Sequence, residues 1–127
     1  PVSPTLLDDL VKLTGAKSID WSKKSECCGA PLLGINDALS KSIMEKKLSN
    51  ARESGADFIA VACPYSFLQF DTFQSKLAKE DTNFQTLGPV LYPQLLGLTM
   101  GIDSNTLGID RHQINIQLLE SYLSREN

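Results

Sequence analysis

The sequence predicts a layered α/β domain in which a small, mostly parallel sheet is flanked by helices. Three observations predict it: apolar residues recur at helical spacing in residues 5–13 and 37–54, residues 57–63 form an almost unbroken apolar run, and another helical pattern follows that run directly. An apolar run of this kind is typical of a strand buried on both faces of a parallel sheet. Alternation of helix, buried strand and helix favours helices layered on such a sheet.

The N-terminal third is expected to hold one helix, one strand and one tight turn. Leucine and valine recur at helical spacing over residues 5–13, and Gly15 is placed to end that helix. Residues 18–21 are predicted to form a short edge strand. Small residues follow at 27–31, where Gly29 can adopt backbone angles that other residues resist, so we expect a turn there.

A second amphipathic helix is predicted to begin with Asn36 or Asp37 as its cap, to run to about Ser54 and to end at Gly55. Four of its residues are expected to form a buried stripe, and four others are expected to face water. The stripe comprises Leu39, Ile43, Leu48 and Ala51, and the solvent face comprises Lys41, Glu45, Lys46 and Arg52.

The second half continues the same alternation. Pro64 follows the buried strand at once and suits the first turn of a helix, so Cys63 is expected at the cap of a third helix over residues 65–79. The remaining predictions are a loop at 82–88, a short strand at 89–92, a helix at 94–100, a connection containing Gly101 and Gly108, and a final amphipathic helix at 113–123.

Length and composition limit the classes of function. A chain of 127 residues that is 42% hydrophobic can bury one core, so we expect a single domain over residues 1–127. The net charge of -3 argues against nucleic-acid binding, and the apolar stretches are too short to span a membrane. No signal peptide pattern is present, which favours the cytoplasm.

The first residue, Pro1, is not a methionine, so we expect the sequence to be a fragment of a longer subunit. If a strand preceding it belonged to the sheet, this chain would have an open sheet edge. Self-association into a homo-oligomer would be one way to cover that edge.

The three cysteines are the residues most suited to chemistry. An odd number that includes an adjacent pair cannot form a complete disulfide framework, which favours metal ligands or redox thiols over bridges. Cys63 lies between a strand end and a helix start, where α/β folds collect ligand sites and where helix amides lower a thiol pKa. Cys27 and Cys28 point in different directions, which suits a multinuclear cluster better than a single zinc ion. Burial as small apolar residues is the alternative for all three.

Three ordered blocks carry a resemblance to a known family. The first is Glu-Cys-Cys-Gly-Ala-Pro-Leu-Leu from Glu26, the second is Cys-Pro-Tyr-Ser-Phe-Leu-Gln-Phe-Asp from Cys63, and the third runs from Pro89 to His112. Together they resemble the C-terminal half of the B subunit of heterodisulfide reductase, in its cysteine-rich CCG domain. The resemblance implies a domain that holds a noncubane [4Fe–4S] cluster at which a disulfide is cleaved, with Cys27, Cys28 and Cys63 as cluster ligands. It also implies partner subunits that bring electrons from flavin and ordinary iron–sulfur clusters.

The chain departs from the family pattern at two points. Ser66 stands where the family has the second cysteine of Cys-x-x-Cys, and the family's further upstream cysteine is absent from this sequence. A serine hydroxyl is a poor substitute for a thiolate, so we expect an incomplete or absent cluster in this fragment and a noncubane or simpler cluster in the parent protein. Relatives also occur in fumarate- and sulfur-metabolising complexes, so the acceptor does not follow from the fold.

Two alternatives remain open at this point. The chain could be a cofactor-less CCG scaffold that docks subunits, or a thiol-only or zinc site with a fourth ligand such as His112. His112 is more simply interpreted as a capping or surface residue. Tyr65 could donate a proton near a reacting sulfur, although packing is the simpler role for it.

Overall fold

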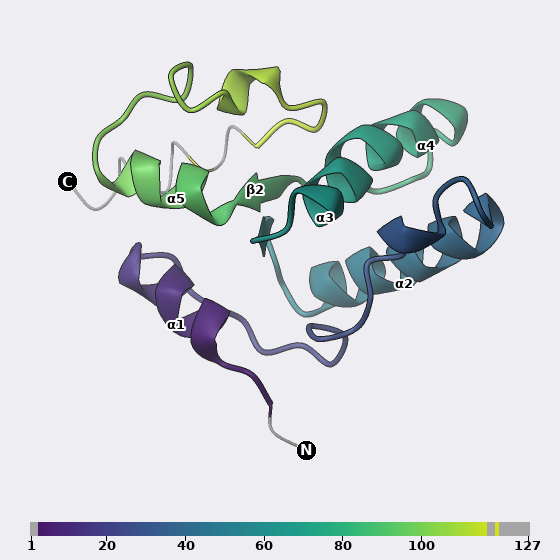
Figure 1. Ribbon diagram of the computed structural model, residues 1–127, viewed down its shortest axis with the longest axis horizontal. Helices are drawn as coiled ribbons and strands as arrows, with labels where there is room; N and C mark the ends of the chain where they lie inside the picture. The colour runs from purple at the N-terminus through teal and green to yellow at the C-terminus, as the bar shows by residue number, and fades with distance from the viewer. Residues whose placement is uncertain (1–2, 117–118, 120–127) are drawn as a thin grey trace.

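The structure, a computed structural model, describes residues 3–116 and residue 119. Two short strands, β1 (Ile59–Val61) and β2 (Pro89–Leu91), lie at its centre (Figure 1). They pair in parallel, with Ile59 opposite Pro89, and form the sheet of the described residues. Helices flank the sheet, so the predicted α/β class is confirmed.

The helices fall into two groups around the strands, as Figure 1 shows. The group drawn on the left consists of α1 (Leu6–Leu13) and α5 (Tyr92–Thr99). The group drawn on the right consists of α2 (Asp37–Glu53) and a continuous helical stretch made of α3 (Pro64–Leu68), η2 (Gln69–Phe73) and α4 (Gln74–Glu80). Single turns of 3₁₀ helix form at η1 (Ala30–Leu32) and η3 (Ile109–Arg111).

Each helix group encloses its own apolar core against the strands. Residues from α2, η2 and β1, together with Leu87 from the loop before β2, form one core, which comprises Met44, Leu48, Ala51, Ile59, Val61, Phe70 and Leu87. Residues from α1, α5, β2 and the C-terminal segment form the other, which comprises Val11, Val90, Leu95, Ile109, Ile116 and Leu119. The side chains of a strand alternate between its two faces, and β1 therefore contributes to both cores.

Helix α2 has the predicted bounds, and Leu48 and Ala51 of the predicted stripe are buried, but the stripe differs at other positions. Asn36 caps it by accepting a hydrogen bond from the backbone N–H of Leu39 at 3.1 Å. The prediction that Leu39 belongs to the buried stripe is wrong, because its side chain is 47% exposed. Met44 and the amine-bearing Lys47 are buried on this face instead.

The helix that starts at Pro64 continues to Glu80, as predicted, but it contains a π turn at η2. The wider turn is accompanied by three consecutive buried residues, Gln69, Phe70 and Asp71. The Asp71 carboxylate accepts hydrogen bonds from the backbone N–H groups of Gln113 and Ile114 at 2.8 and 2.9 Å. This contact ties the C-terminal segment to the helix.

Two predicted elements differ in the structure. Residues 18–21 form no strand, and β1 pairs only with β2 in the described part of the chain. The predicted helix at 113–123 does not begin at Gln113, because the backbone there bonds to Asp71 and residues 113–116 are not helical. The rest of that prediction lies outside the described residues, apart from Leu119. Among the helices that are described, none has the length and apolar character that crossing a membrane requires.

Candidate functional site

Cys63 lies where β1 gives way to α3. Its backbone is extended, with φ -95° and ψ 127°, and the helix begins at the next residue, Pro64. The backbone N–H groups of Ser66 and Tyr65 point at its sulfur and lower the pKa of the Cys63 thiol from its ordinary value of 9.0. The side chain is exposed, so a partner can reach this thiol, and the two amides stabilise its ionised form.

Cys27 and Cys28 lie in the predicted small-residue turn, and Gly29 makes that turn feasible. Gly29 has a φ of 88°, and a Cβ atom there would lie 2.6 Å from the backbone oxygen of Ser40. Its backbone N–H donates to the sulfur of Cys27 at 3.3 Å. Only glycine fits a position that is both left-handed and pressed against a helix backbone.

Two buried polar side chains hold this turn from opposite helices. Ser40 of α2 donates its hydroxyl to the backbone oxygen of Gly29 at 2.8 Å. Gln69 of η2 donates its amide N–H to the backbone oxygen of Cys28 at 3.1 Å and to the Ser40 hydroxyl at 3.0 Å. Because both side chains are buried, water competes little for these bonds, which fix the position of the turn.

Ser66 connects the two cysteine motifs. Its hydroxyl donates to the sulfur of Cys28 at 3.3 Å, and the same side chain also helps to lower the pKa of Cys63. The structure therefore brings residues of both motifs together around one hydroxyl at the carboxyl end of β1. Among residues 3–116 and 119, no three histidine, cysteine or acidic side chains are grouped closely enough to hold a metal ion.

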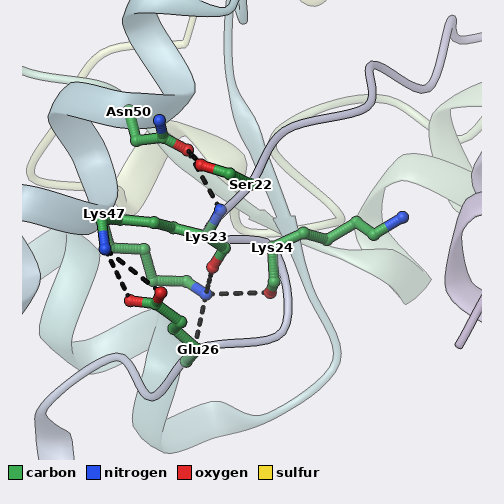
Figure 2. A network of polar contacts seen from close by, with 6 residues as sticks. All are labelled: Ser22, Lys23, Lys24, Glu26, Lys47 and Asn50. Carbon is green, nitrogen blue, oxygen red and sulfur yellow. Dashed lines mark hydrogen bonds and ion pairs between the residues drawn. The ribbon is translucent and has the colours of Figure 1, made fainter. Parts of the chain in front are cut away.

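A buried lysine supports the loop that leads into the cysteine pair. The amine of Lys47 donates to three backbone oxygens, those of Lys23, Lys24 and Glu26, at 2.8, 2.9 and 2.6 Å (Figure 2). It also lies 4.9 Å from the ring centroid of Trp21, a cation–π distance. The three carbonyls turn inward and the loop wraps around this single amine.

Asn50, one turn further along α2, continues the same contact. Its side-chain oxygen accepts from the backbone N–H of Lys23 at 3.1 Å and from the hydroxyl of Ser22 at 3.2 Å (Figure 2). The carboxylate of Glu26 is occupied elsewhere, in an ion pair with the Lys23 amine at 2.9 Å. Helix α2 therefore positions the loop through one amine and one amide.

Burial lowers the pKa of Lys47. Electrostatic attraction to Cys28, Glu26 and Cys27 raises that pKa in part. The side chain is only 6% exposed, and its amine donates to neutral carbonyls. Three donated hydrogen bonds require the three N–H groups of an ammonium, so Lys47 is a cation that α2 buries next to the loop that carries the cysteine pair.

The other predicted candidates do not join the cysteines in this way. His112 is half-buried, and its Nε2 lies 3.1 Å from the side-chain oxygen of Gln94. Its ring packs edge-on against the ring of Phe67, with 4.7 Å between the ring centroids. Burial lowers the pKa of His112, which a nearby Asp71 partly offsets. Tyr65 is 69% exposed, so the predicted packing role for it is wrong.

Sequence reasoning missed the residues that hold the cysteine turn. Lys47 lies three residues after Met44 and four before Ala51, on the buried face of α2, and a lysine at such a position is a sign of an internal amine. Ser40 lies on that same face. Gln69 gave no signal, because its burial depends on the π turn, which the sequence does not reveal.

Comparison with known proteins places these features in a family context. The profile of the cysteine-rich domain family named CCG matches residues 2–71, which is more than half of the chain. The chain is 38% identical over 120 residues to the B subunit of the Ferredoxin/F(420)H(2)-dependent CoB-CoM heterodisulfide reductase of Methanosarcina acetivorans, and the alignment covers 92% of this chain and 40% of that protein.

Two further relatives carry different names. The chain is 35% identical over 107 residues to a protein of Archaeoglobus profundus that is named as similar to the B subunit of heterodisulfide reductase. The alignment covers 81% of this chain and 35% of the relative. It is 27% identical over 114 residues to the 8-methylmenaquinol:fumarate reductase membrane anchor subunit of Wolinella succinogenes, and that alignment covers 89% of this chain and 40% of the relative. The chain therefore spans about two fifths of the length of the curated relatives it matches.

Proposed function

The chain belongs to the cysteine-rich (CCG) domain family, and from this premise we propose that it is part of a longer oxidoreductase subunit that passes electrons to a disulfide or a related acceptor. The complex would be of the heterodisulfide reductase type. Two relatives from different organisms bear that name, at 38% and 35% identity. The relative named for fumarate reductase is the reason to leave the acceptor open.

The observation that carries the proposal is the hydrogen-bonded link from Cys28 through Ser66 towards Cys63. Two motifs that are remote in sequence meet at the carboxyl end of a buried strand, which is where α/β folds bind ligands. The Cys63 sulfur is exposed and receives two backbone N–H groups, an arrangement that stabilises negative charge on a reacting sulfur.

The family implies an iron–sulfur cluster, but the residues of this chain do not fit a complete one by themselves. An ordinary [4Fe–4S] cluster takes four cysteine thiolates, whereas this chain offers three thiols and the hydroxyl of Ser66. The Ser66 hydroxyl is already bonded to the Cys28 sulfur. We propose that Cys27, Cys28 and Cys63 are this chain's share of a ligand set, noncubane or simpler, that the parent protein completes.

Partner subunits follow from the same proposal. A subunit of this type would receive its electrons from flavin and iron–sulfur proteins of the complex, in the cytoplasm. Its own contribution would be the exposed sulfur of Cys63 and the fixed turn at Cys28, between which an acceptor sulfur could be held.

The experiment is to produce the full-length subunit anaerobically and to assay iron and acid-labile sulfide. We expect both in the wild-type subunit and a marked loss in the Cys63→Ala variant. Tyr65→Phe is the matched control, because it changes the exposed neighbour and leaves every thiol in place. A full-length subunit that is folded and carries no iron would refute the proposal.

A second candidate, a CCG scaffold that docks subunits without a cofactor, is favoured by the same Ser66 hydroxyl. A serine that satisfies the Cys28 sulfur gives a stable arrangement with no metal present. On this candidate, subunit association survives the change of Cys27 and Cys28 to alanine, and Ser66→Cys brings no iron to the full-length subunit. Iron gained by Ser66→Cys would contradict it.

A further inference from the structure

A large cavity, lined mainly but not only by apolar side chains, separates β1 from the segment that leads into the cysteine turn. Its volume is about 890 Å³, and α1 closes one side of it. The lining residues that matter here come from α1, from residues 16–21, from β1 and the residue before it, and from α5: Val11, Ala16, Ile19, Phe58, Ala60 and Leu95. We call this cavity the β1 groove.

One edge of β1 opens onto the groove. The backbone N–H of Ile59 donates to Gly88 at 2.9 Å, so Ile59 and Val61 direct their backbone polar groups at β2. Successive residues of a strand direct these groups at opposite edges, so those of Ala60 face away from β2. The described residues provide no second strand on that side.

The opposite wall of the groove is the segment predicted, and not found, as an edge strand. Ser18, Ile19 and Trp21 line the groove from that side. Such a segment cannot form a ladder without a neighbour, and β1 is separated from it by the cavity. A strand lying in the groove would have β1 on one side, at the usual spacing of about 4.8 Å, and residues 18–21 on the other.

We propose that an extended segment of the same subunit, located before Pro1 in the parent chain, fills the β1 groove as a parallel strand. Helix α1 then connects this strand to residues 18–21, as the helix of a strand–helix–strand unit with the usual right-handed crossover. Pro4 and Leu6 line the groove, so the chain reaches it directly from the start of α1. Relatives of which this chain covers 40% leave ample length for such a strand.

The inference rests on the proposal that the chain is part of a longer subunit, but it does not depend on iron. Its failure can therefore be told from failure of the proposed electron transfer by the iron and sulfide assay. A cavity of this volume is also in the range of small-ligand sites, and a second copy could add its own edge. The test distinguishes both from the upstream segment.

The test uses the full-length subunit with a protease site inserted before Ser3. After cleavage, we expect the two pieces to co-elute on size exclusion as a one-to-one complex. Hydrogen exchange gives the second readout. The amide of Ala60 should exchange on the order of 100-fold more slowly in the full subunit than in residues 1–127 alone, whereas the amide of Val61, which faces β2, should be protected in both.

A matched pair of variants tests the opposite wall. Ile19→Asp puts a carboxylate on the apolar wall of the groove and should weaken association of the cleaved pieces at least about tenfold, because the carboxylate would lose its water when a strand fills the groove. Ile35→Asp makes the same change at a side chain that is 81% exposed and should have no effect.

Three results would overturn the inference. The cleaved pieces could separate with Ala60 equally exposed in both forms. Protection of Ala60 could disappear on desalting, which would indicate a small ligand. Protection could also depend on protein concentration in residues 1–127 alone, which would indicate a second copy.

Discussion

Replacing Lys47 with methionine removes the amine that the cysteine loop wraps around and keeps a side chain of similar length. The amine makes three hydrogen bonds to backbone oxygens, at 2.6 to 2.9 Å, from a side chain that is 6% exposed. A methionine there cannot donate, so the oxygens of Lys23, Lys24 and Glu26 lose their donor.

The magnitude follows from these three bonds. A buried carbonyl left without a donor costs about 1 to 3 kcal/mol, and the low end applies here because the loop lies near the surface and water can reach it. Three such losses amount to about 3 kcal/mol. Burying a charge itself costs free energy, so its removal offsets part of this destabilisation. We therefore expect a net loss of about 2 kcal/mol in the free energy of unfolding.

The assay is urea denaturation followed by far-UV circular dichroism and by tryptophan fluorescence. Trp21 is the only tryptophan and lies 4.9 Å from the Lys47 amine, so its emission reports on this site directly. Lys46→Met is the control, because it makes the same change at the exposed neighbouring position. If Lys47→Met and Lys46→Met were equally stable, within about 0.5 kcal/mol, the assigned role of the buried amine would be refuted.

Two further predictions concern the cysteine turn and the helix that begins at Pro64. Gly29→Ala should destabilise the chain by about 2 kcal/mol more than Gly34→Ala in the same denaturation assay. Both glycines have a positive φ, but only a Cβ at Gly29 would meet a backbone oxygen, at 2.6 Å. Equal losses of stability in the two variants would contradict this close approach. In a chain with Cys27 and Cys28 changed to alanine, the pH profile of Cys63 alkylation should have its midpoint below 9.0, and Ser66→Ala should move it upward. Since folding lowers the pKa of Cys63, the contribution of its thiolate to the free energy of unfolding is fully present above pH 9.0 and is lost as the pH falls through the folded-state pKa. An alkylation midpoint at or above 9.0 would show that the helix amides do not stabilise the thiolate.

Much of the fold could be predicted from local patterns because those patterns reflect local physics. The bounds of α1 and α2 follow from apolar periodicity, from the Asn36 cap and from glycines at the helix ends. The buried strand at Ile59–Val61 and the helix start at Pro64 follow from an apolar run and a proline. Cys63 could be placed at a helix start for the same reason.

The remainder depended on contacts between distant parts of the chain. Residues 18–21 have a strand-like sequence, but a strand also needs a neighbour to pair with. The start of the last predicted helix failed because Asp71, far away in sequence, bonds to the backbone at Gln113. Leu39 was assigned to the buried stripe from its helical spacing alone, but it lies in the first turn of α2, where its side chain is 47% exposed.

The candidate site was predicted in part. The residue types and their order indicated Cys27, Cys28 and Cys63, and the substitution at Ser66 stood out against the family pattern. The sequence did not reveal that the Ser66 hydroxyl would bond to Cys28, nor that Ser40 and Gln69 would hold the turn. These bonds arise only when α2 and η2 pack together.

The proposed site requires thiols of separate motifs to meet at one end of β1, and a trivalent arsenical, which bonds to two neighbouring thiols at once, measures that directly. With Cys27 changed to alanine, phenylarsine oxide should bind tightly to the folded chain at one equivalent by joining Cys28 and Cys63. Tight binding should vanish when Cys63 is also changed to serine. Weak binding of equal strength in both variants would mean that the two sulfurs do not meet, and the shared site would have to be abandoned.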